Sequence, residues 1–166
     1  MTSSIAGVAP AEEKEVTVMS VWPSNALYPS GRWLGSMYAI EVGVWPLTVG
    51  NIIALASIPH ALLLFFWRLL PGVGTCYRLT NRRVIEERGL MRVPFKSIEL
   101  DRFDSIEIEV TPGQVWYTAG NLIFKQGAAE TFRLEGVSRP EAFRSQCIKS
   151  HMAYVGVKKA LKNAAA

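Results

Sequence analysis

A long stretch without formal charge limits the folds open to this chain. From Val42 to Trp67 the sequence contains no Asp, Glu, Lys or Arg. A bilayer core of about 30 Å needs about 20 apolar residues in a helix, so the stretch is long enough to span it. Charged residues make up 19% of the chain, below the roughly 25% of an average soluble domain, which also favours a membrane segment.

The whole apolar region is longer than one straight span uses, and two short spans fit it. Turn residues inside it are Trp45-Pro46 and Gly50-Asn51. We therefore predict a transmembrane hairpin over residues 29–71, with helices at Pro29–Pro46 and Asn51–Leu70. A single span is the alternative.

Basic residues on both sides of the region set its orientation. Arg32 stands near its start, and five arginines lie at or after its end, namely Arg68, Arg78, Arg82, Arg83 and Arg88. The predicted turn has no charge, so both ends are expected on the cytoplasmic side. The segment 1–28 is mixed and acidic, unlike a cleaved signal peptide.

Four small residues recur at every fourth position of the first predicted helix. They are Gly31, Gly35, Ala39 and Gly43. In lipid such a stripe lets two helix backbones approach closely. We expect it to pack on the second helix or on another subunit, with chance spacing as the alternative.

Two polar residues stand inside the apolar region. Glu41 either reaches the far membrane interface or contacts another subunit, since intramembrane carboxylates usually face a partner. His60 follows Pro59, which predicts a kink. This histidine either bonds backbone carbonyls freed by the kink, makes an intramembrane partner contact, or acts as a ligand to a haem, chlorin or metal.

The second half of the chain has the alternation of β-strands. Ile106, Ile108 and Val110 alternate with glutamates, and similar runs occur at residues 77–80 and 131–135. Gly and Pro punctuate these runs at intervals near ten residues, which predicts a small antiparallel barrel or sandwich. A helix start follows at residues 138–141. Its expected buried face comprises Phe143, Cys147, Ile148, His151 and Met152, so the fold class is α+β.

Two aromatic residues follow Pro112-Gly113 in a predicted loop. They are Trp116 and Tyr117, and either they contact a partner or they belong to the barrel core.

The run from Tyr77 to Ile85, with its Thr80-Asn81-Arg82-Arg83 core and a later Gly89, resembles the bacterial pleckstrin-homology-like (PH-like) domains. The resemblance covers about residues 74–152 and implies a seven-stranded barrel capped by a C-terminal helix. Many members of that family carry a transmembrane hairpin just before the domain. The expected organisation is an arm at 1–28, the hairpin at 29–71, the PH-like domain at 74–156 and a basic, Ala-rich tail at 157–166.

Arg82 and Arg83 flank the turn of this core motif. Asn tolerates the backbone angles of such a turn. The two guanidinium groups either pair with carboxylates and turn carbonyls or contact anionic lipid headgroups.

The chain carries no recognised catalytic motif, phosphate loop or Cys-x-x-Cys pair. The two cysteines are isolated, and the acidic residues Glu99, Asp101 and Asp104 are expected at a solvated strand edge beside Arg102. We therefore expect neither an enzyme nor a bound metal or cofactor.

These features together predict a membrane-anchored interaction module in the bacterial inner membrane, with both termini and the PH-like domain in the cytoplasm. We expect an accessory or scaffolding subunit of a larger complex, respiratory or photosynthetic for example. Its partners would be the lipid bilayer and other integral-membrane subunits. The alternative is an anionic-lipid sensor that uses the basic residues of 139–166. Nucleic acid is not expected, because the basic residues are not interleaved with aromatic ones.

Overall fold

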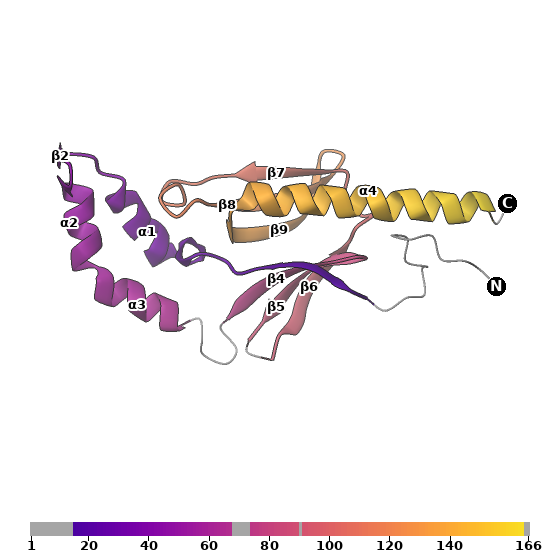
Figure 1. Ribbon diagram of the computed structural model, residues 1–166, viewed down its shortest axis with the longest axis horizontal. Helices are drawn as coiled ribbons and strands as arrows, with labels where there is room; N and C mark the ends of the chain where they lie inside the picture. Colours follow the sequence, from indigo (N-terminus) through magenta and orange to yellow (C-terminus); the bar gives the residue numbers. More distant parts are fainter. Residues whose placement is uncertain (1–14, 68–73, 90, 165–166) are drawn as a thin grey trace.

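The computed structural model describes residues 15–67, 74–89 and 91–164. Two antiparallel sheets pack against a long C-terminal helix, and a group of short helices extends from the opposite end of the sheets (Figure 1).

The first sheet has the strand order β1-β4-β5-β6. Its strands are β1 (Thr17–Val21), β4 (Thr75–Thr80), β5 (Arg83–Arg88) and β6 (Val93–Glu99). In β4, Tyr77 and Leu79 point into the core, as the predicted alternation requires, and Val84 of β5 joins them; all three are at most 2% exposed.

The second sheet has the order β7-β8-β9 and meets the C-terminal helix. Its elements are β7 (Ser105–Glu109), β8 (Ala119–Gln126) and β9 (Ala129–Ser138), followed by α4 (Pro140–Ala164). Phe143 and Cys147 of α4 are fully buried against the core, as expected, whereas Met152 is 66% exposed and was wrongly placed on the buried face. The helix also includes the segment 157–164 of the predicted tail.

Strand β1 shows that the predicted start of the domain at residue 74 is too late. Strand β1 pairs with β4. The chain after β1 reaches the second sheet, where the Ser24 backbone N–H donates a hydrogen bond to the Gly136 carbonyl oxygen (2.8 Å). The apolar region is therefore inserted between the first two strands of one sheet rather than placed before the domain. Residues 1–14 of the predicted N-terminal segment 1–28 lie outside the described residues.

The inserted region differs from the predicted hairpin. It consists of the short 3-10 helix η1 (Asn25–Leu27), α1 (Pro29–Tyr38), β2 (Gly43–Val44), β3 (Leu47–Thr48), α2 (Val49–Ala56) and α3 (Ile58–Trp67). In the described residues no single helix is long and apolar enough to cross a membrane; α2 and α3 meet that requirement only as a pair, and the pair is bent by 55°.

Local chemistry explains these shorter helices. Gly43 has φ of +125°, which no helix accommodates, so the first helix cannot continue to Pro46. The Thr48 hydroxyl caps α2 by accepting a hydrogen bond from the Asn51 backbone (3.3 Å), so the second helix begins before residue 51. It breaks at Ser57, and the predicted end at Leu70 lies outside the described residues.

Candidate functional site

The residues from Val42 to Trp67 project from the sheets and leave many apolar side chains exposed (Figure 1). We call this segment, which holds β2, β3, α2 and α3, the apolar arm. The large side chains with more than half of their surface exposed are Val42, Val44, Trp45, Leu47, Ile52, Leu55, Leu63 and Phe66. Exposed apolar side chains gathered in one segment are uncommon on soluble monomers, so the arm is a candidate functional surface.

A small buried cluster holds the base of the arm against the rest of the protein. Its centre is formed by Leu34 and Tyr38 of α1 and Leu64 of α3, all of which are buried. Around them pack Tyr28, Ile53, Ala54 and Tyr117. The last of these belongs to the β7–β8 loop, so α1 lies between the arm and the second sheet.

The predicted stripe of small residues is wrong as a four-member helical stripe, because only its first two members lie in α1. A Cβ on Gly31 would lie 2.0 Å from a carbonyl oxygen of η1, and one on Gly35 would lie 2.1 Å from a carbonyl oxygen of the β7–β8 loop. Ala39 is the exposed C-cap residue of α1, and Gly43 lies in β2. Close backbone packing therefore occurs, but against a loop and a 3-10 helix.

Glu41 and His60 are both exposed. Glu41 lies in the connection between α1 and β2, and His60 lies in the first turn of α3. The kink that was expected at Pro59 lies just before it, at Ser57, because proline is tolerated in the first turn of a helix. Contacts of these two side chains with another subunit remain predictions.

The two aromatic residues of the β7–β8 loop pack on α1 rather than in the barrel core. The ring of Trp116 meets that of Tyr38 edge to face, with centroids 4.7 Å apart, and still leaves 49% of the residue exposed. Tyr117 lies 6.3 Å from the same ring. Burial raises the pKa of its phenol to about 12, so it stays protonated at physiological pH.

Arg83 of the core motif forms a structural ion pair. Its guanidinium donates to both carboxylate oxygens of Glu15, each at 2.8 Å. The Thr80 hydroxyl accepts the Arg83 backbone N–H at 3.0 Å and contacts the same carboxylate at 2.9 Å. Arg82 is half-buried in the turn, where its carbonyl accepts the Leu100 N–H at 2.9 Å.

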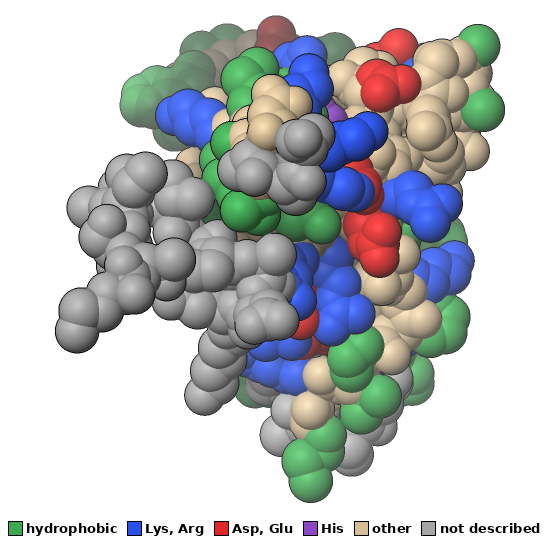
Figure 2. Space-filling model, turned by 90° about the vertical axis from the view of Figure 1, so that its right-hand side faces the viewer, with side chains coloured by type: hydrophobic (Ala, Val, Ile, Leu, Met, Phe, Trp, Pro, Cys, Tyr) green, Lys and Arg blue, Asp and Glu red, His purple; other side chains and the backbone are tan. Residues whose placement is uncertain are grey.

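Further ion pairs lie near this turn, at the end of the molecule opposite the apolar arm (Figure 1). Glu99 pairs with Arg102 at 3.7 Å, and Asp101 pairs with Lys158 of α4. These are two of the three acidic residues that the sequence predicted at a solvated edge. The third, Asp104, accepts a hydrogen bond from the Gly127 backbone N–H at 3.1 Å. Figure 2 looks at this end, where Lys and Arg side chains gather with Asp and Glu between them.

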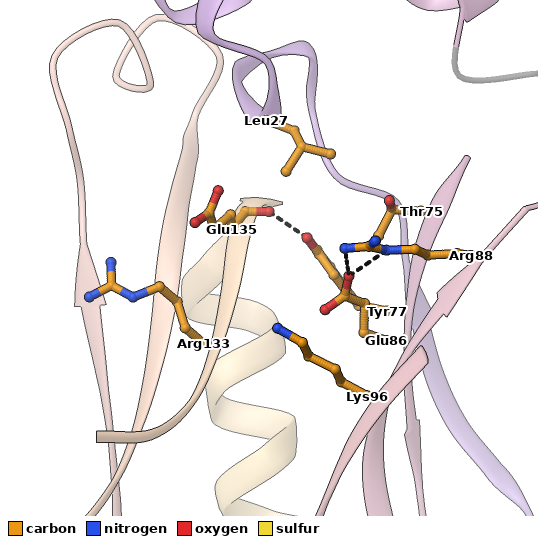
Figure 3. A pocket seen from close by; sticks show the side chains of 8 residues that line it. All are labelled: Leu27, Thr75, Tyr77, Glu86, Arg88, Lys96, Arg133 and Glu135. Atoms are coloured by element: carbon orange, nitrogen blue, oxygen red, sulfur yellow. Dashed lines mark hydrogen bonds and ion pairs between the residues drawn. The ribbon is translucent and has the colours of Figure 1, made fainter. Parts of the chain in front are cut away.

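A polar cavity of about 420 Å³ opens between the two sheets (Figure 3). Its lining is contributed by Leu27, Thr75, Tyr77, Glu86, Arg88, Lys96, Arg133 and Glu135. Most of its charged groups are occupied by neighbours. Arg88 donates to Glu86 through two nitrogens, at 3.0 and 3.1 Å.

Lys96 is the lining cation without an ion pair among the described residues, and its ammonium group points toward the cavity (Figure 3). The Tyr77 hydroxyl donates to the Glu135 carbonyl oxygen at 2.7 Å. Burial raises the pKa of this phenol well above its ordinary value of 10, so it acts as a donor. The cavity can therefore accept a small polar or anionic group.

Within the described residues, no group of three or more His, Cys, Asp or Glu side chains could hold a metal ion. Both cysteines are buried, and burial raises the pKa of the Cys147 thiol to about 12. A thiol with so high a pKa is a poor nucleophile.

Sequence reasoning missed the cavity, because its lining comes from η1 and four strands that are distant in the chain. The Arg88–Glu86 pair had a visible signal, since residues two apart in a strand share a face. The partner of Arg83 had none, because Glu15 precedes it by 68 residues.

Comparison with known proteins extends the resemblance seen in the core motif. A family model described as Bacterial PH domain matches residues 16–153. The match begins just before β1, spans the inserted arm and both sheets, and ends within α4. No curated protein and no solved structure matches the chain. Two antiparallel sheets with a C-terminal helix fit this assignment, and the chain belongs to the bacterial PH domain family.

Proposed function

We propose that this protein is a membrane-anchored, non-catalytic interaction module, and that the apolar arm is its anchor. The observation that carries the proposal is the exposed apolar surface of an uncharged segment inserted into a PH-like fold. Burying such side chains in lipid gains roughly 25 cal/mol per Å² of apolar surface removed from water. Water is therefore an unfavourable environment for this segment, and the hydrocarbon of a bilayer is a favourable one.

The shape of the apolar arm supports its insertion into the bilayer from one side of the membrane. Both of its ends lead back to the same sheet, and the β2–β3 turn lies at its outer end (Figure 1). The helices α2 and α3 have eight and ten residues, or together about 27 Å at 1.5 Å per residue, close to the thickness of a bilayer core. The bend of 55° favours a re-entrant arm over the two short spans expected from the sequence.

The PH-like barrel would then face the cytoplasm from the inner membrane and bind other subunits there. The family assignment supports an interaction module, and an accessory or scaffolding role in a larger membrane complex is the form that we propose. Its partners would be other integral-membrane subunits, which an arm with exposed aromatic residues such as Trp45 and Phe66 can contact within the bilayer.

Lipid sensing by the basic C-terminal residues fits the geometry less well. The C-terminal end of α4 and the β4–β5 turn lie at the end opposite the apolar arm (Figure 1). Arg83 and Lys158 are already paired with carboxylates. A bilayer that holds the arm therefore does not meet these groups, and we do not favour this alternative.

Extraction of membranes with alkaline carbonate tests the anchor. The full-length protein is expected to stay in the membrane pellet. The variant Leu55→Lys/Leu63→Lys places two charges on exposed positions of the arm, each costing about 2.5–3.5 kcal/mol at the centre of a membrane helix, and should move to the supernatant. The matched control Met152→Lys/Leu161→Lys adds the same charge to exposed apolar positions of α4 and should stay in the pellet. Release of the unaltered protein would contradict the anchor.

Isolation of the tagged protein in a mild detergent tests the interaction role. Co-migration with integral-membrane proteins at a fixed ratio on a sizing column is expected. A species that runs alone after extraction from its native membrane would contradict the accessory-subunit proposal.

A further inference from the structure

A second hollow, of about 300 Å³, lies between α1 and the β7–β8 loop, and we call it the α1 cleft. It is distinct from the cavity between the sheets. Its lining residues are Arg32, Trp33, Ser36, Thr111 and Pro112. One wall therefore comes from α1 and the other from the start of the loop.

Two polar groups of the α1 cleft have no partner within the described part of the chain. Arg32 is a half-buried residue, and its guanidinium makes no hydrogen bond or ion pair there. The Thr111 hydroxyl oxygen is buried and likewise has no hydrogen-bond partner. A guanidinium carries five N–H donors, and a buried hydroxyl without a partner costs about 1–3 kcal/mol. Both groups can be satisfied by one anionic acceptor seated between them.

The walls of the cleft are fixed in place by backbone contacts. A Cβ on Gly113 would lie 1.9 Å from the Arg32 carbonyl oxygen, and one on Gly35 would lie 2.1 Å from the Gly113 carbonyl oxygen. The Thr111 backbone N–H donates to the Gln114 side chain at 2.9 Å. Because the backbone of both walls is held in place, only side chains need to become ordered when a ligand enters.

The α1 cleft is located where a bilayer would present phosphate groups. Helix α1 leads directly into the apolar arm. Trp33, in the cleft, is 62% exposed, and tryptophan is enriched at the level of lipid headgroups. An arginine beside an exposed tryptophan at this level suits a phosphate oxygen on one side and the glycerol region on the other.

We propose that the α1 cleft binds a phosphate group, with Arg32 as its charge partner and the Thr111 hydroxyl as a second donor. The phospholipid headgroups of the bilayer are the source that the position of the cleft favours. The choice of source rests on the proposed membrane anchor, whereas the binding of phosphate rests on the cleft alone.

Native mass spectrometry of the detergent-solubilised, delipidated full chain tests this inference. The probes are a short-chain phosphatidylglycerol and, separately, inorganic phosphate. Arg32→Gln should weaken phosphatidylglycerol binding about tenfold or more, as expected for loss of a charge-assisted hydrogen bond, and Thr111→Val should weaken it less. The control Arg102→Gln removes an exposed arginine at the opposite end and should leave binding unchanged. Melting temperatures of all variants confirm folding.

Two results would overturn phosphate binding by the α1 cleft. In the first, Arg32→Gln binds lipid as tightly as the unaltered chain does. In the second, Arg102→Gln loses as much affinity as Arg32→Gln, which would indicate a general charge effect. A third result, binding of inorganic phosphate with the same Arg32 dependence but no binding of lipid, would overturn the headgroup as the source of the phosphate. Vesicle flotation tests the membrane anchor independently of the α1 cleft. Because Arg32→Gln leaves the apolar arm unchanged, this variant should still float with the vesicles. An unaltered chain that fails to float refutes the anchor, and the inorganic phosphate measurement still tests the cleft.

Discussion

Two glycines determine how closely α1 meets the β7–β8 loop. Gly35 and Gly113 bring two backbones together at distances that leave no room for a Cβ, since the nearest carbonyl oxygens would lie 2.1 and 1.9 Å away. Backbone atoms cannot move aside as a flexible side chain can. The apolar arm and the second sheet are therefore joined through a contact that only glycine permits.

The substitution Gly35→Ala should separate α1 from the loop and lower the free energy of unfolding by about 1–3 kcal/mol. Thermal unfolding of the full chain in detergent measures the loss, and a red shift of tryptophan emission should report exposure of Trp116. The matched control is Gly156→Ala in α4, where nothing lies within 4 Å of the new Cβ. It should stabilise the protein by up to about 1 kcal/mol. Equal effects of the two substitutions would contradict this account.

The Glu15–Arg83 pair predicts a pH dependence of stability. The Arg83 hydrogen bonds hold the pKa of the Glu15 carboxyl below its ordinary value of 4.5. A carboxyl whose pKa is lowered by folding stabilises the fold above pH 4.5. This contribution is lost as the pH falls through the pKa that the carboxyl has in the folded state. The pair is partly exposed, so its contribution is about 1 kcal/mol or less.

Denaturation of Glu15→Gln between pH 3 and pH 7 checks this expectation. The variant should be less stable than the unaltered chain at neutral pH and equal to it at the acid end. Glu141→Gln is the control, because that side chain is 78% exposed and lies 3.6 Å from Arg144. A constant difference across the pH range would show that the pair does not titrate as described.

At the scale of elements, a buried amide network shapes the β7–β8 loop on which α1 rests. The Asn121 side-chain oxygen accepts from the Gln114 side chain at 2.8 Å and from the Gly136 backbone at 3.0 Å. Gln114 in turn accepts the Thr111 N–H. Asn121 thus connects the loop to β9, and through the loop to α1 and the apolar arm.

Asn121→Ala should leave two buried donors without an acceptor and cost about 1–3 kcal/mol for each. Chemical denaturation gives the loss, and faster proteolysis within the loop should accompany it. Gln126→Ala, at the exposed end of the same strand, should change stability by less than about 0.5 kcal/mol. A neutral Asn121→Ala would mean that the network does not support the loop.

The elements differ in how far the sequence could predict them. Strands β4 and β7 have clear alternation, and α4 begins close to the predicted residue. Strand β1 escaped prediction because its sequence TVMSV is half exposed and its partner β4 follows only after the whole apolar arm. The shape of the arm also escaped prediction, since an uncharged run shows that a segment is apolar but not where its helices bend.

The candidate sites also differ in how far the sequence could predict them. The apolar arm was visible as an uncharged run, because composition alone shows how apolar a segment is. The cavity and the α1 cleft were not, because their lining residues come together only through sheet pairing and loop packing. The sequence identifies Arg32 only as a marker of membrane orientation, whereas in the structure it lines a cleft together with Thr111.

At the scale of the whole molecule, the protein is polarised along its length. The apolar arm lies at one end, and an end where Lys and Arg side chains gather with Asp and Glu lies at the other (Figures 1 and 2). Because the arm is inserted between two strands of the sheet, its position relative to the barrel is set by both of its ends. An anchor of this kind would hold the barrel in a defined orientation above the bilayer, as a docking surface for other subunits requires.

The measurement that tests the central claim most directly is quenching of Trp45 by brominated lipids. Trp45 lies in the β2–β3 turn and is 84% exposed. In a full-length variant with the other four tryptophans replaced by phenylalanine, vesicles of lipids brominated on their acyl chains should quench its emission. Water-soluble acrylamide should have little effect. Strong quenching by acrylamide and none by the brominated lipids would contradict insertion of the apolar arm.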